Sequence, residues 1–389
     1  MKRFCRISAA MLAALLCCGC GWMDGSYVSV TSHQVGYLRT DDEPFVVSSY
    51  PQLRSALMGL VDSGAERALI TLVNYPEDEL PSDMENAIGY VSAIYPIGAY
   101  AVDTISYEQS VSGQDALSVT VSYRRSRSDI DQIRNVRGIK GAEDAIAGAL
   151  QECQRALVLQ ITGYEEADFV QLAEDYSLLH PDIVMEPPFV TSRVYPEQGP
   201  VRILEMQFSY RSSRDQLRSM RAEVEPVFSS AQLYVSPEAE DEVKLSQLYN
   251  FLMQRADYTF QFQTSITPAY SLLCYGVGDS RAFADVYGAM CRQVGLEALT
   301  VSGTCRGESR FWNIVRCGDS FYHIDLLRSY AGEGFRLYSD SQMSDYVWDY
   351  SAYPVCGTTP QMPPETLPQL PLNGNTQTAS EPSTEPSEP

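Results

Sequence analysis

The sequence predicts an α+β protein in which two tandem β-α-β-β-α sandwich repeats precede a different α+β domain. Two observations support this class. Residues 43–232 repeat themselves with a period of about 88 residues, and such a period identifies a repeat architecture. Beyond residue 236 the repeat stops, and an apolar helix stripe is followed by several short strands. We therefore place repeat 1 at 43–153, repeat 2 at 154–235 and the last domain at 236–357.

Three landmarks recur in the same order in both repeats. They are Arg67-Ala68-Leu69 with Arg155-Ala156-Leu157, Tyr107-Glu108 with Tyr195-Pro196-Glu197, and Ser122-Tyr123-Arg124 with Ser209-Tyr210-Arg211. In repeat 1 we expect strands at 68–75, 101–111 and 116–123 and helices at 78–94 and 128–152. In repeat 2 we expect strands at 156–164, 190–195 and 202–210 and helices at 166–179 and 213–227. Residues 117–123 alternate apolar and polar side chains, as a half-buried strand does.

The two ends of the chain are predicted to lie outside the fold. Residues 1–19 combine a basic start with an apolar run that is too short to span a membrane, since a span needs about 20 apolar residues. This pattern is typical of a signal peptide. Residues 20–42 then form a linker. Residues 358–389, rich in Pro, Ser, Thr and Glu, are predicted to be a disordered tail.

The signal peptide ends in Gly19-Cys20, which resembles the bacterial lipobox. The resemblance implies that Cys20 becomes the first residue and carries lipid. The protein would then be an extracytoplasmic lipoprotein of the cell envelope, held at the membrane by its acyl chains. The alternative is an ordinary signal peptide that is cut elsewhere.

The net charge and the spacing of the cysteines argue against some classes of partner and site. The net charge of −22 argues against nucleic acid as a partner. Four of the ten cysteines lie in residues 1–20, no pair has Cys-x-x-Cys spacing, and only three histidines are present. We therefore expect no metal site and no cofactor. The six remaining cysteines either form one or two disulfides or remain free thiols.

The last domain carries a series of separated motifs. A helix is expected at 239–260, with Val243, Leu248, Phe251 and Leu252 facing inward. A second helix opens at Ser280 with an apolar stripe formed by Phe283, Tyr287, Met290 and Val294. Strands are expected at 299–303, 311–315 and 320–326. Along this stretch the motifs are Gly295-Leu296, Val301-Ser302-Gly303, Phe311-Trp312-Asn313 and Tyr322-His323-Ile324-Asp325.

The order of these motifs over residues 269–327 resembles the transglutaminase-like family, a branch of the papain-like architecture. The family uses a cysteine thiolate at a helix N-terminus, an imidazole base and a carboxylate that orients the imidazole. The resemblance places these three groups at Ser280, Arg310 and Asp325. Trp312 and Asn313 fit the motif that supports them.

Two of the three catalytic groups are therefore replaced. We expect Ser280 to cap its helix and Arg310 to form an ion pair with Asp325. We also expect the domain to be a catalytically inactive pseudoenzyme that serves as a binding or scaffold module for an envelope peptide or protein. The alternative is an active transglutaminase or cysteine peptidase acting on envelope peptides or proteins, with Cys274 as nucleophile and His323 as base.

Overall fold

The computed structural model describes residues 45–109, 115–258, 268–328 and 334–357. The predicted signal peptide, Cys20, the linker and the C-terminal tail lie outside the described residues. Within them, no helix combines the length and the apolar character that crossing a bilayer would require. The chain divides into two compact units, residues 1–130 and 131–389, and each is described by itself.

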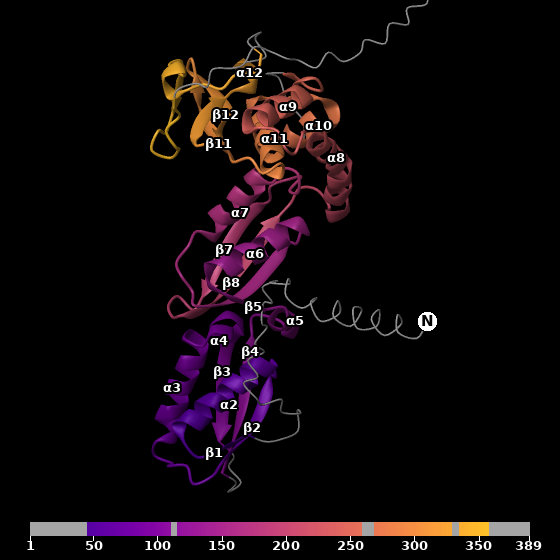
Figure 1. The fold of residues 1–389 in the computed structure, drawn as a ribbon. Helices are drawn as coiled ribbons and strands as arrows, with labels where there is room; N and C mark the ends of the chain where they lie inside the picture. Colours follow the sequence, from indigo (N-terminus) through magenta and orange to yellow (C-terminus); the bar gives the residue numbers. More distant parts are fainter. Residues whose placement is uncertain (1–44, 110–114, 259–267, 329–333, 358–389) are drawn as a thin grey trace, which may run out of the picture. The chain divides into compact units, whose positions relative to one another are not determined.

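The first unit is a two-layer sandwich with helices on one face of a four-stranded sheet (Figure 1). Its elements are β1 (Phe45–Val47), α2 (Tyr50–Ser63), β2 (Arg67–Leu72), α3 (Leu80–Ala93), α4 (Pro96–Ala101), β3 (Val102–Gln109), β4 (Ala116–Tyr123) and α5 (Arg127–Asp131). The strand order is β1-β2-β4-β3, with β1 parallel to β2 and the other pairs antiparallel. The buried faces of α2 and α3 pack on β2 and β4. On the opposite face of β4, Ser118 and Ser122 are exposed.

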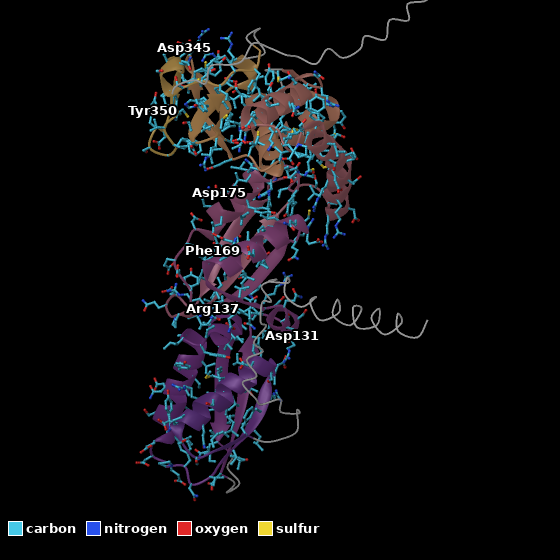
Figure 2. All side chains as sticks on the ribbon, in the orientation of Figure 1. Asp131, Arg137, Phe169, Asp175, Asp345 and Tyr350 are labelled. Atoms are coloured by element: carbon cyan, nitrogen blue, oxygen red, sulfur yellow. The ribbon has the colours of Figure 1, made fainter. Side chains whose placement is uncertain are left out.

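The second unit begins with a sheet of the same design. Its elements are β5 (Arg134–Arg137), α6 (Gly138–Gln151), β6 (Ala156–Thr162), α7 (Phe169–Leu179), β7 (Phe189–Tyr195) and β8 (Val201–Ser209). The order β5-β6-β8-β7 and the strand directions repeat those of the first sheet. Phe169, at the start of α7, is buried in the core between helices and sheet (Figure 2). The α+β class and the internal repeat are thus confirmed.

The order of elements within a repeat differs from the prediction. The helix expected at 128–152 is wrong, because this stretch forms α5, the edge strand β5 and α6. β5 pairs with β6, so β5 and α6 belong to the second sheet. Each repeat therefore reads β-α-β-α-β-β. The edge strand was missed because its residues, Arg-Asn-Val-Arg, are polar and largely exposed, and they show no apolar alternation.

The remaining residues of the second unit form a helical layer against an antiparallel sheet (Figure 1). The elements are α8 (Arg214–Tyr234), α9 (Asp241–Met253), β9 (Asp257–Tyr258), α10 (Pro268–Tyr275), β10 (Val277–Gly278), α11 (Ser280–Gln293), β11 (Ala298–Cys305), β12 (Glu308–Cys317), β13 (Ser320–Ile324), α12 (Leu326–Arg328), a 3₁₀ turn (Asp340–Gln342) and β14 (Tyr346–Trp348). The four-stranded sheet has the order β13-β12-β11-β14. The central helix α11 is buried along most of its length and packs on β11 and β12.

Two details of the helical layer differ from expectation. α8 does not simply close the second repeat, because Phe228 and Ala231 in its second half belong to the core around α11. In α9, Leu248, Phe251 and Leu252 are buried as predicted, but Val243 is 47% exposed. α9 ends at Met253, earlier than the predicted residue 260.

Candidate functional site

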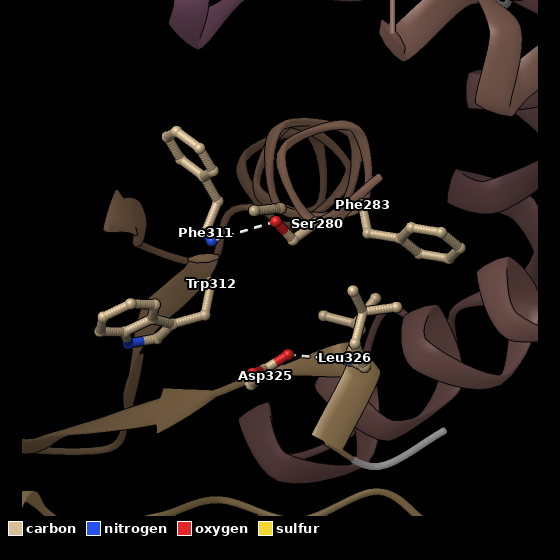
Figure 3. A pocket seen from close by; sticks show the side chains of 8 residues that line it. Ser280, Phe283, Phe311, Trp312, Asp325 and Leu326 are labelled. Carbon is tan, nitrogen blue, oxygen red and sulfur yellow. Dashed lines mark hydrogen bonds between the residues drawn. The ribbon is translucent and has the colours of Figure 1, made fainter. Parts of the chain in front are cut away.

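The sequence resemblance predicts the family's nucleophile at the N-terminus of α11. Asp279 has extended backbone angles, and its side chain accepts a hydrogen bond from the Ala282 amide at 2.9 Å. Asp279 is therefore the N-cap, and the prediction that Ser280 caps the helix is wrong. Ser280 is the first helical residue, 8% exposed, and its hydroxyl accepts a hydrogen bond from the Phe311 amide at 3.3 Å (Figure 3). Ser280 thus links the start of α11 to β12.

Arg310 and Asp325 form a two-bond ion pair next to Ser280 and Phe311. The guanidinium Nε donates to Asp325 Oδ2 at 2.8 Å, and Nη2 donates to Oδ1 at 3.1 Å. The side chains are 16% and 1% exposed, respectively. The ion pair that the sequence predicts is therefore present and largely shielded from water. This bidentate geometry is the strongest arrangement available to a carboxylate and a guanidinium.

Further donors hold the Asp325 carboxylate in place. The Tyr346 hydroxyl donates to Oδ2 at 2.7 Å, and the backbone amide of Leu327 donates to Oδ1 at 2.9 Å. A longer bond of 3.3 Å comes from the Arg328 amide, so Asp325 also caps the short helix α12. Burial and the neighbouring Asp325 charge both raise the pKa of Tyr346, which keeps its hydroxyl protonated as a donor. Sequence reasoning missed Tyr346, because it lies 21 residues from Asp325.

The space around these groups is closed. It is lined by Ser280, Phe283, Ala284, Phe311, Trp312, Asp325, Leu326 and Leu327 (Figure 3). No part of it is wide enough for a water molecule. Among the described residues, the helix, the sheet and α12 therefore meet here as packed surfaces that leave no room for a ligand.

Trp312 and Asn313 bind the two layers of the domain together. Asn313 is fully buried, and its amide nitrogen donates to the carbonyl oxygen of Ala284 in α11 at 2.9 Å. Trp312 is 1% exposed and packs edge-on against the rings of Tyr346 and Trp348. Both residues thus act as packing and linking groups at the position that the motif predicts.

His323, the alternative base, lies away from Ser280 in a hydrogen-bonded network of its own. Its Nδ1 accepts from the indole nitrogen of Trp312 at 3.0 Å, and its Nε2 is 2.8 Å from Asp340 Oδ1. Because an indole N–H can only donate, Nδ1 is the acceptor and Nε2 carries the proton. Burial lowers the pKa of His323 and favours this neutral form. Neither nitrogen has a lone pair to spare for proton abstraction.

Cys274, the alternative nucleophile, is placed in a different cluster. It is half-buried at the end of α10 and packs with Tyr270 against Met220 of α8. Burial raises the pKa of its thiol, so the thiolate is disfavoured. The structure does not bring Cys274 and His323 together. All six cysteines of the described residues are free.

One group of side chains has the composition of a metal site. The ligand atoms of His323, Asp340 and Cys356 lie within 4.8 Å of one another. Hydrogen bonds already occupy the two ring nitrogens of His323, and the Cys356 amide donates to Asp340 Oδ2 at 3.0 Å. Burial raises the pKa of Cys356 to about 12, which opposes the thiolate that a metal requires. This group fits a structural network better than an ion site.

Comparison with known proteins identifies the last domain. The family model described as the transglutaminase-like superfamily matches residues 230–326. No curated protein matches the chain. Similar solved structures are a TGase (9% identity, 49% of this chain and 58% of that chain, TM-score 0.25) and a protein of Cytophaga hutchinsonii provisionally described as a cysteine protease (12% identity, 36% and 62%, TM-score 0.23).

A protein of Parabacteroides distasonis provisionally described as a protease is also similar (6% identity, 44% of this chain and 40% of that chain, TM-score 0.22). The chain thus spans less than two thirds of each of these solved chains. The match of the family model coincides with α9, α11 and the strands β11 to β13, in which the motifs lie. Residues 230–326 therefore form a transglutaminase-like domain.

Proposed function

We propose that this chain is an envelope lipoprotein whose transglutaminase-like domain is a non-catalytic scaffold module. The observation that carries the proposal is the buried Arg310–Asp325 ion pair, at the two residues where the sequence resemblance predicts the family's imidazole and carboxylate. An arginine stays protonated at working pH and accepts no proton, so it cannot act as a base.

The other groups near the ion pair support the same conclusion. The Ser280 hydroxyl needs a base to become a nucleophile, and its described partner is the Phe311 amide, which is a donor. The Asp325 oxygens accept bonds from Arg310, Tyr346 and Leu327. The carboxylate therefore serves as a structural anchor for three segments of the domain.

The closed cleft favours a scaffold over a module that holds a peptide in the family's cleft. A bound peptide needs an open space, and the space beside Ser280 admits no water molecule. We therefore assign the domain a scaffold role in the envelope.

Thiol alkylation tests the absence of catalysis. The full chain without its leader is treated with iodoacetamide at pH 7.5, and mass spectrometry locates the alkylated residues over time. We expect slow labelling at Cys274 and Cys356, because burial raises the pKa of both thiols. The same chain in urea is the control, in which all six cysteines of the described residues should react. Rapid and selective labelling of Cys274 in the native chain would support the active enzyme instead.

The lipid anchor is tested separately. The full chain is expressed in a bacterium that processes lipoproteins, and membrane and soluble fractions are compared. We expect the wild type in the membrane fraction and the Cys20→Ser variant in the soluble fraction, because the variant lacks the acylated thiol. Cys18→Ser, a change two residues away, is the matched control and should remain with the membrane. Membrane association of Cys20→Ser would contradict the anchor.

A further inference from the structure

The first unit contains a cavity of about 590 Å³ whose lining is strongly basic. It lies where β2 begins and β4 ends, and the segment after β4 completes it. Four arginines line it, namely Arg67, Arg124, Arg125 and Arg127. Glu66 is the one acidic residue of the lining. The cavity therefore gathers a net positive charge in one place.

This charge contrasts with the rest of the chain. The whole sequence has 28 Lys and Arg against 50 Asp and Glu, so a lining with four cations and one anion departs sharply from its composition. Like charges that converge on one concave surface repel one another, and the walls of a cavity strengthen their field. An anion with several negative charges would relieve this repulsion.

The shape of the site follows from the sheet register. Arg67 and Thr120 stand opposite each other in the β2–β4 ladder, and Ser122 follows Thr120 by two residues on the same face. Arg67 is exposed and makes no ion pair with any described residue. These residues lie on the sheet face that α2 and α3 leave uncovered, so an arginine and two hydroxyls are presented together.

The segment after β4 is held in a fixed position. The guanidinium of Arg124 donates to the carbonyl oxygens of Tyr100, at 3.1 Å, and Ala99, at the end of α4. The guanidinium of Arg125 lies over the Tyr100 ring, 5.3 Å from its centroid. This side of the cavity is thus preorganised, which lowers the entropic cost of binding a ligand.

In the second repeat, the arginines of the same motif contact acidic residues. Arg211 and Arg214 follow β8 as Arg124 and Arg127 follow β4. Arg214 contacts Glu152 at 3.1 Å, and Arg211 contacts Glu186 at 3.8 Å.

Glu152 is the residue before the left-handed turn that follows α6. In the first unit the residue before the equivalent turn, at Gly64, is Ser63. At this position the first unit therefore has a hydroxyl where the second repeat has a carboxylate.

We infer that this cavity binds a soluble phosphate-bearing ligand with more than one negative charge. A guanidinium group can donate two parallel hydrogen bonds to two oxygens of a phosphate. Several arginines can bind one multivalent anion together. The volume lies within the range of small-ligand sites, roughly 300–1,000 Å³. A monocarboxylate would bind one arginine, and the electrostatic repulsion among the other arginines would remain. The inference does not depend on the lipid anchor or on the inactivity of the last domain.

Calorimetric titration of the full chain with inorganic tripolyphosphate, at pH 7.5 and constant salt, tests the site. We expect saturable binding to one site. Arg67→Gln should weaken it about five- to tenfold, as the loss of one charge-assisted bond does. Arg155→Gln is the matched control, since it makes the same charge change at the corresponding landmark of the second repeat, and it should bind as the wild type does. Both arginines are exposed, so both variants should fold.

A second variant and a second probe make the test decisive. Ser122→Asp adds a negative charge at an exposed position of the lining and should also weaken binding. Vesicles of anionic phospholipid distinguish a free ligand from a lipid headgroup, and we expect them not to compete with tripolyphosphate. The inference is overturned if no saturable binding occurs, if Arg155→Gln weakens binding as much as Arg67→Gln, or if the vesicles displace tripolyphosphate.

Discussion

The buried carboxylate of Asp325 depends on one guanidinium for its charge balance, which makes Arg310 important for stability. Removing one member of a buried ion pair costs about 3–5 kcal/mol, because the other charge stays buried without a partner. We expect Arg310→Ala to lower the free energy of unfolding by about 3 kcal/mol, near the lower end because Arg310 is partly exposed. Urea titration measures this change.

The control for Arg310→Ala is Arg316→Ala. Arg316 contacts Glu297 at 3.6 Å, but both side chains are about half exposed, so its loss should change stability by less than about 1 kcal/mol. Equal urea midpoints for Arg310→Ala and the wild type would show that Asp325 does not need this partner.

Asp285, on α11, should make the stability of the second unit depend on pH. Burial raises the pKa of Asp285 to about 6, although the nearby Arg281 acts in the opposite direction. The folded state therefore holds a proton that the unfolded chain releases near pH 4. The stabilisation is complete below about pH 4 and is lost as the pH rises through about 6.

Asp285→Asn removes this dependence. We expect the variant to melt at a higher temperature than the wild type at pH 7.5, with a gain of about 2–3 kcal/mol, and to match it near pH 4. Asp319→Asn, at an exposed residue, should leave the melting temperature unchanged at both pH values. A wild type whose melting temperature falls between pH 7.5 and pH 5 relative to Asp285→Asn would refute the assigned direction.

At the candidate site, sequence reasoning identified the charged pair but not its surroundings. The motif spacing was enough to bring Arg310 and Asp325 together, because β12, which carries Arg310, pairs with β13, and Asp325 directly follows β13. It did not separate Asp279 from Ser280 as the cap, since both residue types cap helices well and only the backbone angles decide. Tyr346 reaches Asp325 from β14, a strand of three residues that is too short to show a periodic pattern.

Among the elements, the repeat could be predicted from sequence but its register could not. The landmark at Leu69 and Leu157 aligns a residue that is 52% exposed with one that is 3% exposed. Strand pairing instead makes Ile70 equivalent to Leu159, because each is paired with a buried leucine of the neighbouring strand. A slip of one residue exchanges the two faces of a strand, so matching letters alone cannot fix it.

The cap of α11 yields a prediction at the scale of the element. Asp279→Ala removes the acceptor for the Ala282 amide and should cost about 1 kcal/mol of stability. Ser280→Ala removes only the longer bond from the Phe311 amide, at 3.3 Å, and should cost less. Urea titration of both variants gives the order of the two costs. The reverse order would mean that Ser280, and not Asp279, holds the first turn of the helix.

For the whole molecule, the sequence predicts three folded domains, whereas the structure groups the second repeat with the transglutaminase-like domain. The reason is α8, which carries Met220 in a cluster with Met185 of the second repeat and Tyr270 of α10. Arg292 of α11 also donates to the carbonyl oxygen of Leu179 at the end of α7. Such contacts between separate elements leave no periodic trace in the sequence, so they could not be predicted from it.

Hydrogen exchange tests this grouping. Leu57 and Leu159 are fully buried leucines in the cores of the first and second sheets, and replacing either by alanine should cost about 2–5 kcal/mol. We expect Leu57→Ala to accelerate the exchange of slow amides only within residues 45–130. Leu159→Ala should accelerate exchange through residues 131–357, because the second repeat and the last domain share buried contacts. Acceleration confined to residues 131–213 in Leu159→Ala would show that the second repeat opens independently of the last domain.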